Sequence, residues 1–239
     1  MTRDMPIHIE YPEGETAPRT AFIMGDPERV RLLSSLLGEP RVVGQKRGYL
    51  IVKGVHEDKE VLLASHGIGG PSLLILVEEL RMLGVTRFVR LGTTGAFSGE
   101  LGIGDVVVAS GACMIPGSCG LSLYAEGLTP PLAASPSLAS EASRLLSGAT
   151  VRHVIAPVLC SDAFYAEGPG LFERASRAGC VSVDMETGAL YGFAWARRAE
   201  AVSVLVVSNV IRGSGEELAG QDLLEARFRS IFSALAGLA

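Results

Sequence analysis

The stretch Arg90-Leu91-Gly92-Thr93-Thr94-Gly95-Ala96 carries the most information about the fold, together with His66-Gly67-Ile68-Gly69-Gly70-Pro71-Ser72 before it. Each segment follows an apolar run and is rich in glycine, which predicts a strand that ends in a glycine-rich turn. The stretch after Arg90 combines an arginine, threonine hydroxyls and backbone N–H groups that a ligand can approach closely. This combination suits a small oxyanion, most simply phosphate.

Two further segments look like companions of these, Gly25-Asp26-Pro27-Glu28-Arg29 and Val183-Asp184-Met185-Glu186. Arg90 stands among Val, Phe and Leu, where a charge is costly unless it is paired. A structural salt bridge would explain it, but the glycines and threonines that follow favour an anion site. Arg29, one turn into a predicted helix, is by itself better explained as a solvated helix arginine, and Arg47 is uninformative alone.

The carboxylates of Asp184 and Glu186 stand where a strand is followed by a helix. They could simply stabilise the helix dipole. The sharper hypothesis is a sugar diol, whose hydroxyls donate to the carboxylates while Met185 packs beneath the ring. Phe164 could belong to the core or could stack on a planar base.

Apolar runs and helical periodicities alternate along the chain, which predicts an α/β fold. The strands are expected at Thr20–Met24, Tyr49–Lys53, Val61–Ser65, Arg87–Leu91, Asp105–Ser110, Val151–Cys160 and Ala201–Ser208. The helices are expected from Pro27 to Leu37 with Gly38 as a stop, from Pro71 to before Gly84, from Pro136 to about Leu146 with Ser135 as N-cap, and over Leu171–Ala178, Met185–Arg198 and Gln221–Leu238. Residues 111–134 are rich in Gly, Pro and Ser and predict a long excursion of unknown role.

Composition sets further limits. No linker divides the 239 residues, so one domain over residues 1–239 is expected, and 48% hydrophobic with only 6% aromatic residues predicts an aliphatic core. A net charge of −5 with interspersed signs argues against nucleic acid or a membrane surface as partner. No signal peptide or spanning segment is expected, and a cytoplasmic, reducing location fits best. Cys113 and Cys119 could pair, or could be free thiols.

Several common chemistries are excluded by the absence of their motifs. The chain has no GxxxxGK[ST], no GxSxG and no HExxH, and its Cys and His residues form no zinc-like spacing. No metal or organic cofactor is therefore expected.

With these motifs in order, the chain resembles the nucleoside phosphorylase I superfamily, which contains purine nucleoside, uridine and archaeal methylthioadenosine phosphorylases. The resemblance runs from about His8 to Glu217. It rests on Gly25-Asp26-Pro27-x-Arg29, Arg47-Gly48, Gly67-Ile68-Gly69-Gly70-Pro71-Ser72, Arg90-x-Gly92-Thr93-Thr94-Gly95, Ser161-Asp162-x-Phe164-Tyr165 and Asp184-Met185-Glu186. It implies a twisted mixed β-sheet partly closed into a barrel and surrounded by helices, and a homo-oligomer, commonly a hexamer built as a trimer of dimers.

The resemblance also implies roles for residues. Phosphate would be bound by Gly25, Arg29, Arg90 and Thr93, with Arg47 entering from a neighbouring subunit. The ribose would be held by Met185 and Glu186, with His8 from that neighbour. The base pocket would be lined by Thr94, Gly95, Phe164, Asp184 and Asn209.

One departure from the family pattern concerns the base. Hexameric purine enzymes place an acidic aspartate in the segment that here is Val207-Ser208-Asn209-Val210-Ile211-Arg212. Asn209 cannot supply a proton as an acid, but it can donate a hydrogen bond to a carbonyl oxygen that gains charge as the base leaves. The Gln and Arg with which uridine enzymes recognise uracil are missing after Tyr165; Arg212 could compensate, or could face solvent.

The sequence thus predicts phosphorolysis of a nucleoside by inorganic phosphate, with Asn209, Arg90 and Glu186 as the catalytic residues. Oxo-base nucleosides are favoured, with inosine or guanosine slightly ahead of uridine. Alternatives in the same family are a uridine or a methylthioadenosine phosphorylase. Alternatives of another class are a hydrolytic nucleosidase, which the arginines disfavour, and a non-catalytic nucleoside-binding protein.

Overall fold

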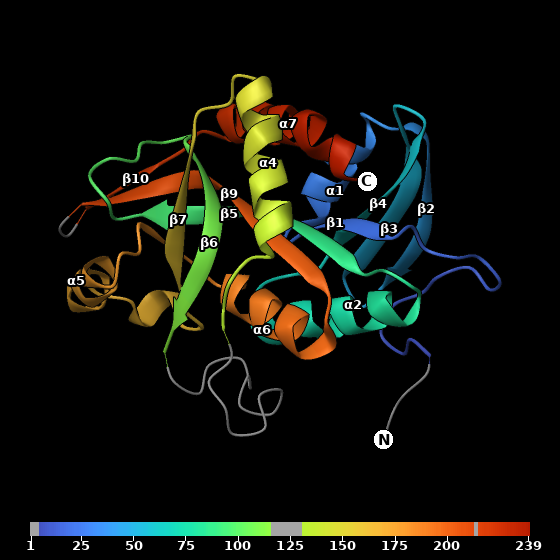
Figure 1. Cartoon of the computed structure of the whole chain (residues 1–239), viewed down its shortest axis with the longest axis horizontal. Coiled ribbons are helices and arrows are strands. Elements are labelled where there is room, and N and C mark those ends of the chain that lie inside the picture. The colour runs from blue at the N-terminus through green and yellow to red at the C-terminus, as the bar shows by residue number, and fades with distance from the viewer. Residues whose placement is uncertain (1–4, 116–130, 213–214) are drawn as a thin grey trace.

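The computed structural model of the protein describes residues 5–115, 131–212 and 215–239. Strands and helices alternate along these residues, which confirms the predicted α/β class (Figure 1). The strands are β1 (Thr20–Met24), β2 (Gly38–Lys46), β3 (Tyr49–His56), β4 (Lys59–Ser65), β5 (Arg87–Ala96), β6 (Val106–Met114), β7 (His153–Cys160), β8 (Ser182–Asp184), β9 (Glu200–Arg212) and β10 (Gly215–Leu218). The helices are α1 (Pro27–Ser34), α2 (Gly70–Met82), α4 (Pro136–Gly148), η2 (Phe164–Ala166), α5 (Pro169–Arg177), α6 (Thr187–Arg197), α7 (Gln221–Leu235) and η3 (Ala236–Leu238).

Five of the strands close into a barrel, as the resemblance implies. In the order β5, β9, β6, β7, β8 each strand pairs with the next, and β8 pairs back to β5. The sheet continues outward from β5 through β1, β4 and β3 to β2, while β10 pairs with the far end of β9. The barrel mixes parallel and antiparallel pairs, because β8 runs antiparallel to β5, and β6 antiparallel to β9.

Strand β5 changes neighbours along its length, and this corrects one prediction. Its first half pairs with β1 at Arg87–Arg90, and its last residues, Gly95 and Ala96, pair with β8. Strand β9 pairs with β5 along its whole length, from Arg87 to Ala96. The Gly-Thr-Thr-Gly stretch is therefore strand and not the turn that was predicted, because barrel closure supplies backbone partners where β1 ends.

Other predicted boundaries were also wrong. Helix α1 ends at Ser34, and β2, which was not predicted, begins at Gly38 and carries Pro40. A proline is tolerated there because β2 is at the edge of the sheet and, among the described strands, pairs only with β3, with irregular register. Strand β6 runs on to Met114, into the predicted excursion, and the short β10 was missed.

Smaller differences occur at the ends of elements. Strand β9 extends past Ser208 to include Asn209, because β10 pairs with this extension. Ser135 precedes α4 as predicted, but its hydroxyl accepts the N–H of Ala201 and does not cap the helix. Cys119 is not among the described residues, so its pairing with Cys113 lies outside the described structure, as does most of the predicted excursion.

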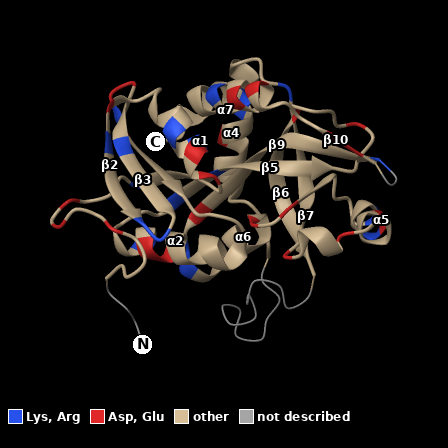
Figure 2. Ribbon diagram, turned by 180° about the vertical axis from the view of Figure 1, so that it is seen from behind, with Lys and Arg blue, Asp and Glu red and all other residues tan. Residues whose placement is uncertain are grey.

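The helices cover the sheet from two sides (Figure 1). Helices α2 and α6 pack together along one side, and α1, α4 and α7 lie on the other. The core between them is mainly Val, Leu, Ile and Ala, as the composition predicts, with edge-to-face phenylalanine pairs such as Phe22 and Phe232. Acidic and basic residues are interspersed along the ribbon in Figure 2. Among the described residues, no helix is long and apolar enough to cross a membrane.

Candidate active site

A pocket of about 1610 Å³ lies at the point where the neighbour of β5 changes from β1 to β8. Its volume is ample for a small organic ligand together with an anion. The turns after β1 and β4, the strand β5, the junction of β8 and α6, the segment from Asp162 to Phe172 and the ends of β9 and β10 all contribute to its wall. Segments distant in sequence meet here because the barrel brings their strand ends together.

The predicted phosphate ligands Gly25, Arg29, Arg90 and Thr93 all line this pocket. The guanidinium of Arg29 lies 3.8 Å from the ring centroid of Phe228, and its Nη1 donates to the carbonyl of Leu91 at 3.4 Å. Burial lowers the pKa of Arg29 to about 10, with Arg90 adding to the effect and Asp26 opposing it. Arg29 still carries its charge at neutral pH and is held beside the pocket by the aromatic ring.

Arg90 is buried and pairs with two carboxylates. Its Nη1 donates to Oδ2 of Asp184 at 2.8 Å, and its Nη2 donates to Oε2 of Glu186. Burial works against the charge, but Glu186 and Asp184 outweigh it and raise the pKa of Arg90. Nε of Arg90 has no partner within the described residues. Arg90 therefore forms a buried salt bridge and also lines the pocket.

The two carboxylates are themselves fixed by the local fold. Asp184 ends β8 and accepts the N–H and hydroxyl of Thr187, at 3.0 and 2.7 Å, at the start of α6. Glu186 accepts the N–H of Gly69 at 2.6 Å. Gly69 has a φ of 91°, so the glycine-rich turn after β4 can bring its N–H to Glu186. Asp184 and Glu186 can thus stabilise the start of α6 and line the ligand pocket at the same time.

His66 is a buried group that the motif analysis did not use. It follows β4, is fully buried, and neither ring nitrogen has a partner within the described residues. Burial holds the pKa of His66 well below its usual value, and the nearby charge of Arg90 adds to this. The imidazole is therefore neutral and adds no positive charge beside the pocket.

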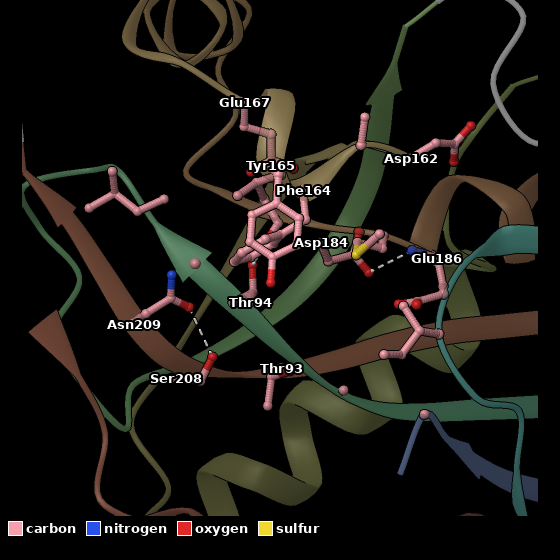
Figure 3. Close-up of a pocket in the computed structure, with 18 of the residues that line it drawn as sticks. Thr93, Thr94, Asp162, Phe164, Tyr165, Glu167, Asp184, Glu186, Ser208 and Asn209 are labelled. Atoms are coloured by element: carbon pink, nitrogen blue, oxygen red, sulfur yellow. Dashed lines mark hydrogen bonds between the residues drawn. The ribbon is translucent and has the colours of Figure 1, made fainter. Parts of the chain in front are cut away.

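Most of the candidate base-binding residues lie at the other end of the pocket. Thr94, Gly95, Phe164 and Asn209 line the pocket, and the hydroxyl of Thr94 donates to the carbonyl of Val183 at 2.8 Å. In the view of Figure 3, Asn209 lies to the left of the aromatic side chains and Glu186 to the right. Phe164 is 51% exposed, so it is available to stack on a ligand and is not a core residue.

The position of Asn209 depends on an irregularity in the pairing of β5 with β9. Thr94 is opposite Val207, but Gly95 is opposite Asn209, so Ser208 is an extra residue. A Cβ atom on Gly95 would lie 2.8 Å from Nδ2 of Asn209, so only glycine leaves room for the amide. The bulge directs Asn209 towards the pocket, as bulges near active sites commonly do.

Three predicted residues lie outside the pocket of their own chain. Arg47 is exposed in the turn between β2 and β3, and Arg212 is exposed at the end of β9. Nδ1 of His8 bonds to Oε1 of Glu79, a buried residue of α2, at 2.6 Å. The contribution of His8 and Arg47 to a neighbouring subunit stays a prediction.

Sequence reasoning missed several residues that line the pocket. Tyr165 packs edge-to-face on Phe164, with ring centroids 5.1 Å apart, and Glu167, two residues further on, also lines the pocket. Glu216 on β10 also lines the pocket and accepts from Nδ2 of Asn209. Tyr165 could have been inferred from its neighbour, but no local signal marks Glu216, because only the β9–β10 pairing brings it to the site. No group of metal-ligating side chains occurs in the described ranges.

The fold and the pocket define a barrel-based α/β protein that brings two arginines, paired carboxylates and an aromatic-lined subsite together. The family model described as phosphorylase superfamily matches residues 19–236, and the chain belongs to this family.

Relatives of similar length carry more specific names. A guanosine phosphorylase of Halorubrum lacusprofundi is 30% identical over 208 residues, which cover 87% of this chain and 85% of the relative. A purine nucleoside phosphorylase DeoD-type of Bacillus cereus is 31% identical over 220 residues, which cover 91% and 92%. A protein of the same name from Bacillus mycoides shows the same similarity.

Proposed function

We propose that the protein cleaves the N-glycosidic bond of 6-oxopurine nucleosides with inorganic phosphate, giving a pentose 1-phosphate and the free base. The observation that carries this proposal is the order of groups along one pocket. Arg29, Arg90, Glu186 and Asn209 all line it, Arg90 pairs with Glu186, and Figure 3 shows Phe164 between Glu186 and Asn209. The names of the purine and guanosine relatives support the choice of base.

Each group has a role that its surroundings allow. The arginines position phosphate against C1′ of the ribose and neutralise its charge. Glu186 keeps lone pairs free on oxygens that already bind Arg90 and Gly69, and these can accept the ribose hydroxyls. As the bond breaks, charge builds on the base, and a donor preplaced at its carbonyl lowers the barrier.

A hydrolytic nucleosidase is the main competitor, because the same pocket could admit water. It would have no use for Arg29 and Arg90 at the end away from the base. Base release from guanosine should therefore depend on added phosphate and yield a sugar phosphate, measured by separating the products. Base release at the same rate without phosphate would contradict the proposal, and tight binding without base release would indicate a binding protein.

Asn209→Asp is expected to shift base preference towards 6-aminopurines. The nearby carboxylate of Glu216 would raise the pKa of the new aspartate, so a protonated carboxyl could donate to N7 and accept from the amine. A hydrogen bond to a charged group contributes about 1.5–3 kcal/mol, so kcat/KM for adenosine relative to inosine should rise about tenfold to a hundredfold. Kinetics of both proteins with adenosine, inosine, guanosine and uridine provide the measurement. Adenosine as the best substrate of the unmodified protein would show that Asn209 does not set the preference.

The proposal extends to the assembly and its surroundings. The protein forms a homo-oligomer built from dimers and is located in the cytoplasm. It needs no cofactor, and phosphate is its co-substrate. Sedimentation would give the oligomeric state, and activity unchanged by a chelator would support the absence of a metal.

A further inference from the structure

The short strand β10 adds a carboxylate to the base end of the pocket. Its pairing with β9 places Glu216 opposite Ile211 in an antiparallel hairpin, next to the bulge that carries Asn209. Glu216 lines the pocket and accepts a hydrogen bond from Nδ2 of Asn209. Its side chain is otherwise exposed, so it does not serve the core of the protein.

Glu216 settles which way the amide of Asn209 faces. A carboxylate can only accept, so the –NH₂ group must point to Glu216, and the hydroxyl of Ser208 then donates to Oδ1 at 3.0 Å. One N–H of the amide is left over for a ligand. The pocket therefore presents a donor from Asn209 beside an acceptor from Glu216.

This order of donor and acceptor matches one kind of base edge. A 6-oxopurine carries a carbonyl oxygen, which accepts, next to its N1–H, which donates. Adenine carries the reverse order, with an amine next to an unprotonated ring nitrogen. Adenine would therefore place a donor against the N–H of Asn209 and an acceptor against the carboxylate of Glu216, and would lose both contacts.

A second carboxylate adds to the same preference. Oε1 of Glu167 is buried and has no partner among the described residues. Burial raises the pKa of Glu167, a hydrogen bond with Ser161 opposes this, and the charges of Asp184 and Glu216 raise it further. The carboxylates thus lie close enough to influence one another, and their combined potential favours a base edge that presents N–H groups.

We propose that Glu216 is a specificity-determining residue, which orients the amide of Asn209 and itself accepts the ring N–H beside the carbonyl of the base. The inference rests on the proposed phosphorolysis and adds a requirement for an unsubstituted N1–H. It explains how an asparagine, which has no fixed orientation by itself, can discriminate between bases.

The experiment compares guanosine with 1-methylguanosine, which lacks the N–H, in the unmodified protein and in Glu216→Ala. The unmodified protein should prefer guanosine by about tenfold to a hundredfold in kcat/KM, and this ratio should fall towards one in the variant. Glu217→Ala is the matched control, because Glu217 is the next residue of β10, is exposed, and does not line the pocket.

The outcomes separate the two claims. An unchanged ratio in Glu216→Ala, or an equal fall in Glu217→Ala, would overturn the inference while leaving the phosphorylase intact. Absence of phosphate-dependent guanine release from the unmodified protein would instead overturn the proposed function. Circular dichroism of the variants checks that each is folded.

Discussion

At the scale of single residues, Arg90 shows how one side chain can form a buried salt bridge and also line the candidate ligand pocket. It is buried, and its charge is compensated by Asp184 and Glu186, so removing the guanidinium would leave two carboxylates close together without a counter-charge. Breaking a buried pair in this way costs about 3–5 kcal/mol. A variant that tests catalysis must therefore keep the positive charge.

Arg90→Lys should lower kcat/KM for phosphate by on the order of 10²-fold. An ammonium keeps the charge but cannot reach both carboxylates and an anion at once, as a planar guanidinium can. Initial rates over a phosphate series give the measurement. Arg87→Lys is the control, because Arg87 lies on the same strand but pairs with Glu200 and does not line the pocket. A phosphate dependence like that of the unmodified protein would refute the role of Arg90.

His66 should make the protein less stable in mild acid. Its pKa in the folded state lies well below 6.5, whereas the unfolded chain takes up a proton near pH 6.5. The contribution of the neutral imidazole is therefore complete above pH 6.5 and is lost as the pH falls towards the folded-state pKa. Between pH 7 and pH 5 the free energy of unfolding should fall by about 2 kcal/mol because of this one group.

The contribution of His66 can be isolated from the slope of the free energy of unfolding against pH. Urea unfolding of His66→Gln across this range should show a shallower pH dependence than the unmodified protein, whatever its absolute stability. Equal slopes for the two proteins would show that His66 does not titrate on unfolding.

At the scale of elements, β5 organises the site because it belongs to two parts of the sheet. Its first half is fixed by β1 and its last residues by β8, so the residues between them border a gap into which ligand-binding groups project. Glycine is needed at two places on this strand. A Cβ atom on Gly92 would lie 2.6 Å from Nη1 of Arg90, and one on Gly95 would meet Asn209.

Gly95→Ala should therefore damage catalysis more than folding. The added methyl group displaces the amide of Asn209, and overpacking of this kind costs about 1–3 kcal/mol. If most of that cost falls on the base contact, kcat/KM should drop by about tenfold to a hundredfold. Kinetics and thermal unfolding should be measured alongside Gly99→Ala, where an added Cβ meets nothing within 4 Å. A fully active Gly95→Ala protein would show that Asn209 tolerates displacement.

At the scale of the whole molecule, the charges at the end of the pocket that we propose binds phosphate are balanced within one chain. Arg29 and Arg90 are offset by Asp184 and Glu186, and the buried His66 is neutral. A phosphate dianion would gain more from an additional cation, and the resemblance assigns this place to Arg47 of a neighbouring subunit. Ile68 lines the pocket yet is 79% exposed, which fits a surface that a second subunit covers.

Shared sites can be tested by complementation. Arg47→Ala and Arg90→Lys proteins should each be impaired, and dissociating and reassembling them together should restore a substantial part of the activity. Mixed dimers then contain one site with both arginines intact. Reassembly of each variant alone is the control. If the mixture is no more active than its components, Arg47 does not act across an interface.

The sequence by itself determined the fold class, the phosphate-end motifs and the candidate base contact at Asn209. These depend on local patterns, since glycines, an arginine in an apolar strand and carboxylates before a helix can all be recognised from neighbours in the chain. The barrel also followed from resemblance, because several ordered motifs together specify one topology.

Tertiary structure alone decided that the Gly-Thr-Thr-Gly stretch is strand, that β2 and β10 exist, and that Glu216 faces Asn209. Propensity predicts a turn wherever glycines gather, yet β8 and β9 supply hydrogen-bond partners that hold this stretch extended. Likewise, nothing near Glu216 in the chain marks it as part of a site. Its position depends on a bulge in one strand and a hairpin after it, and such long-range pairings are set by the packing of the whole barrel.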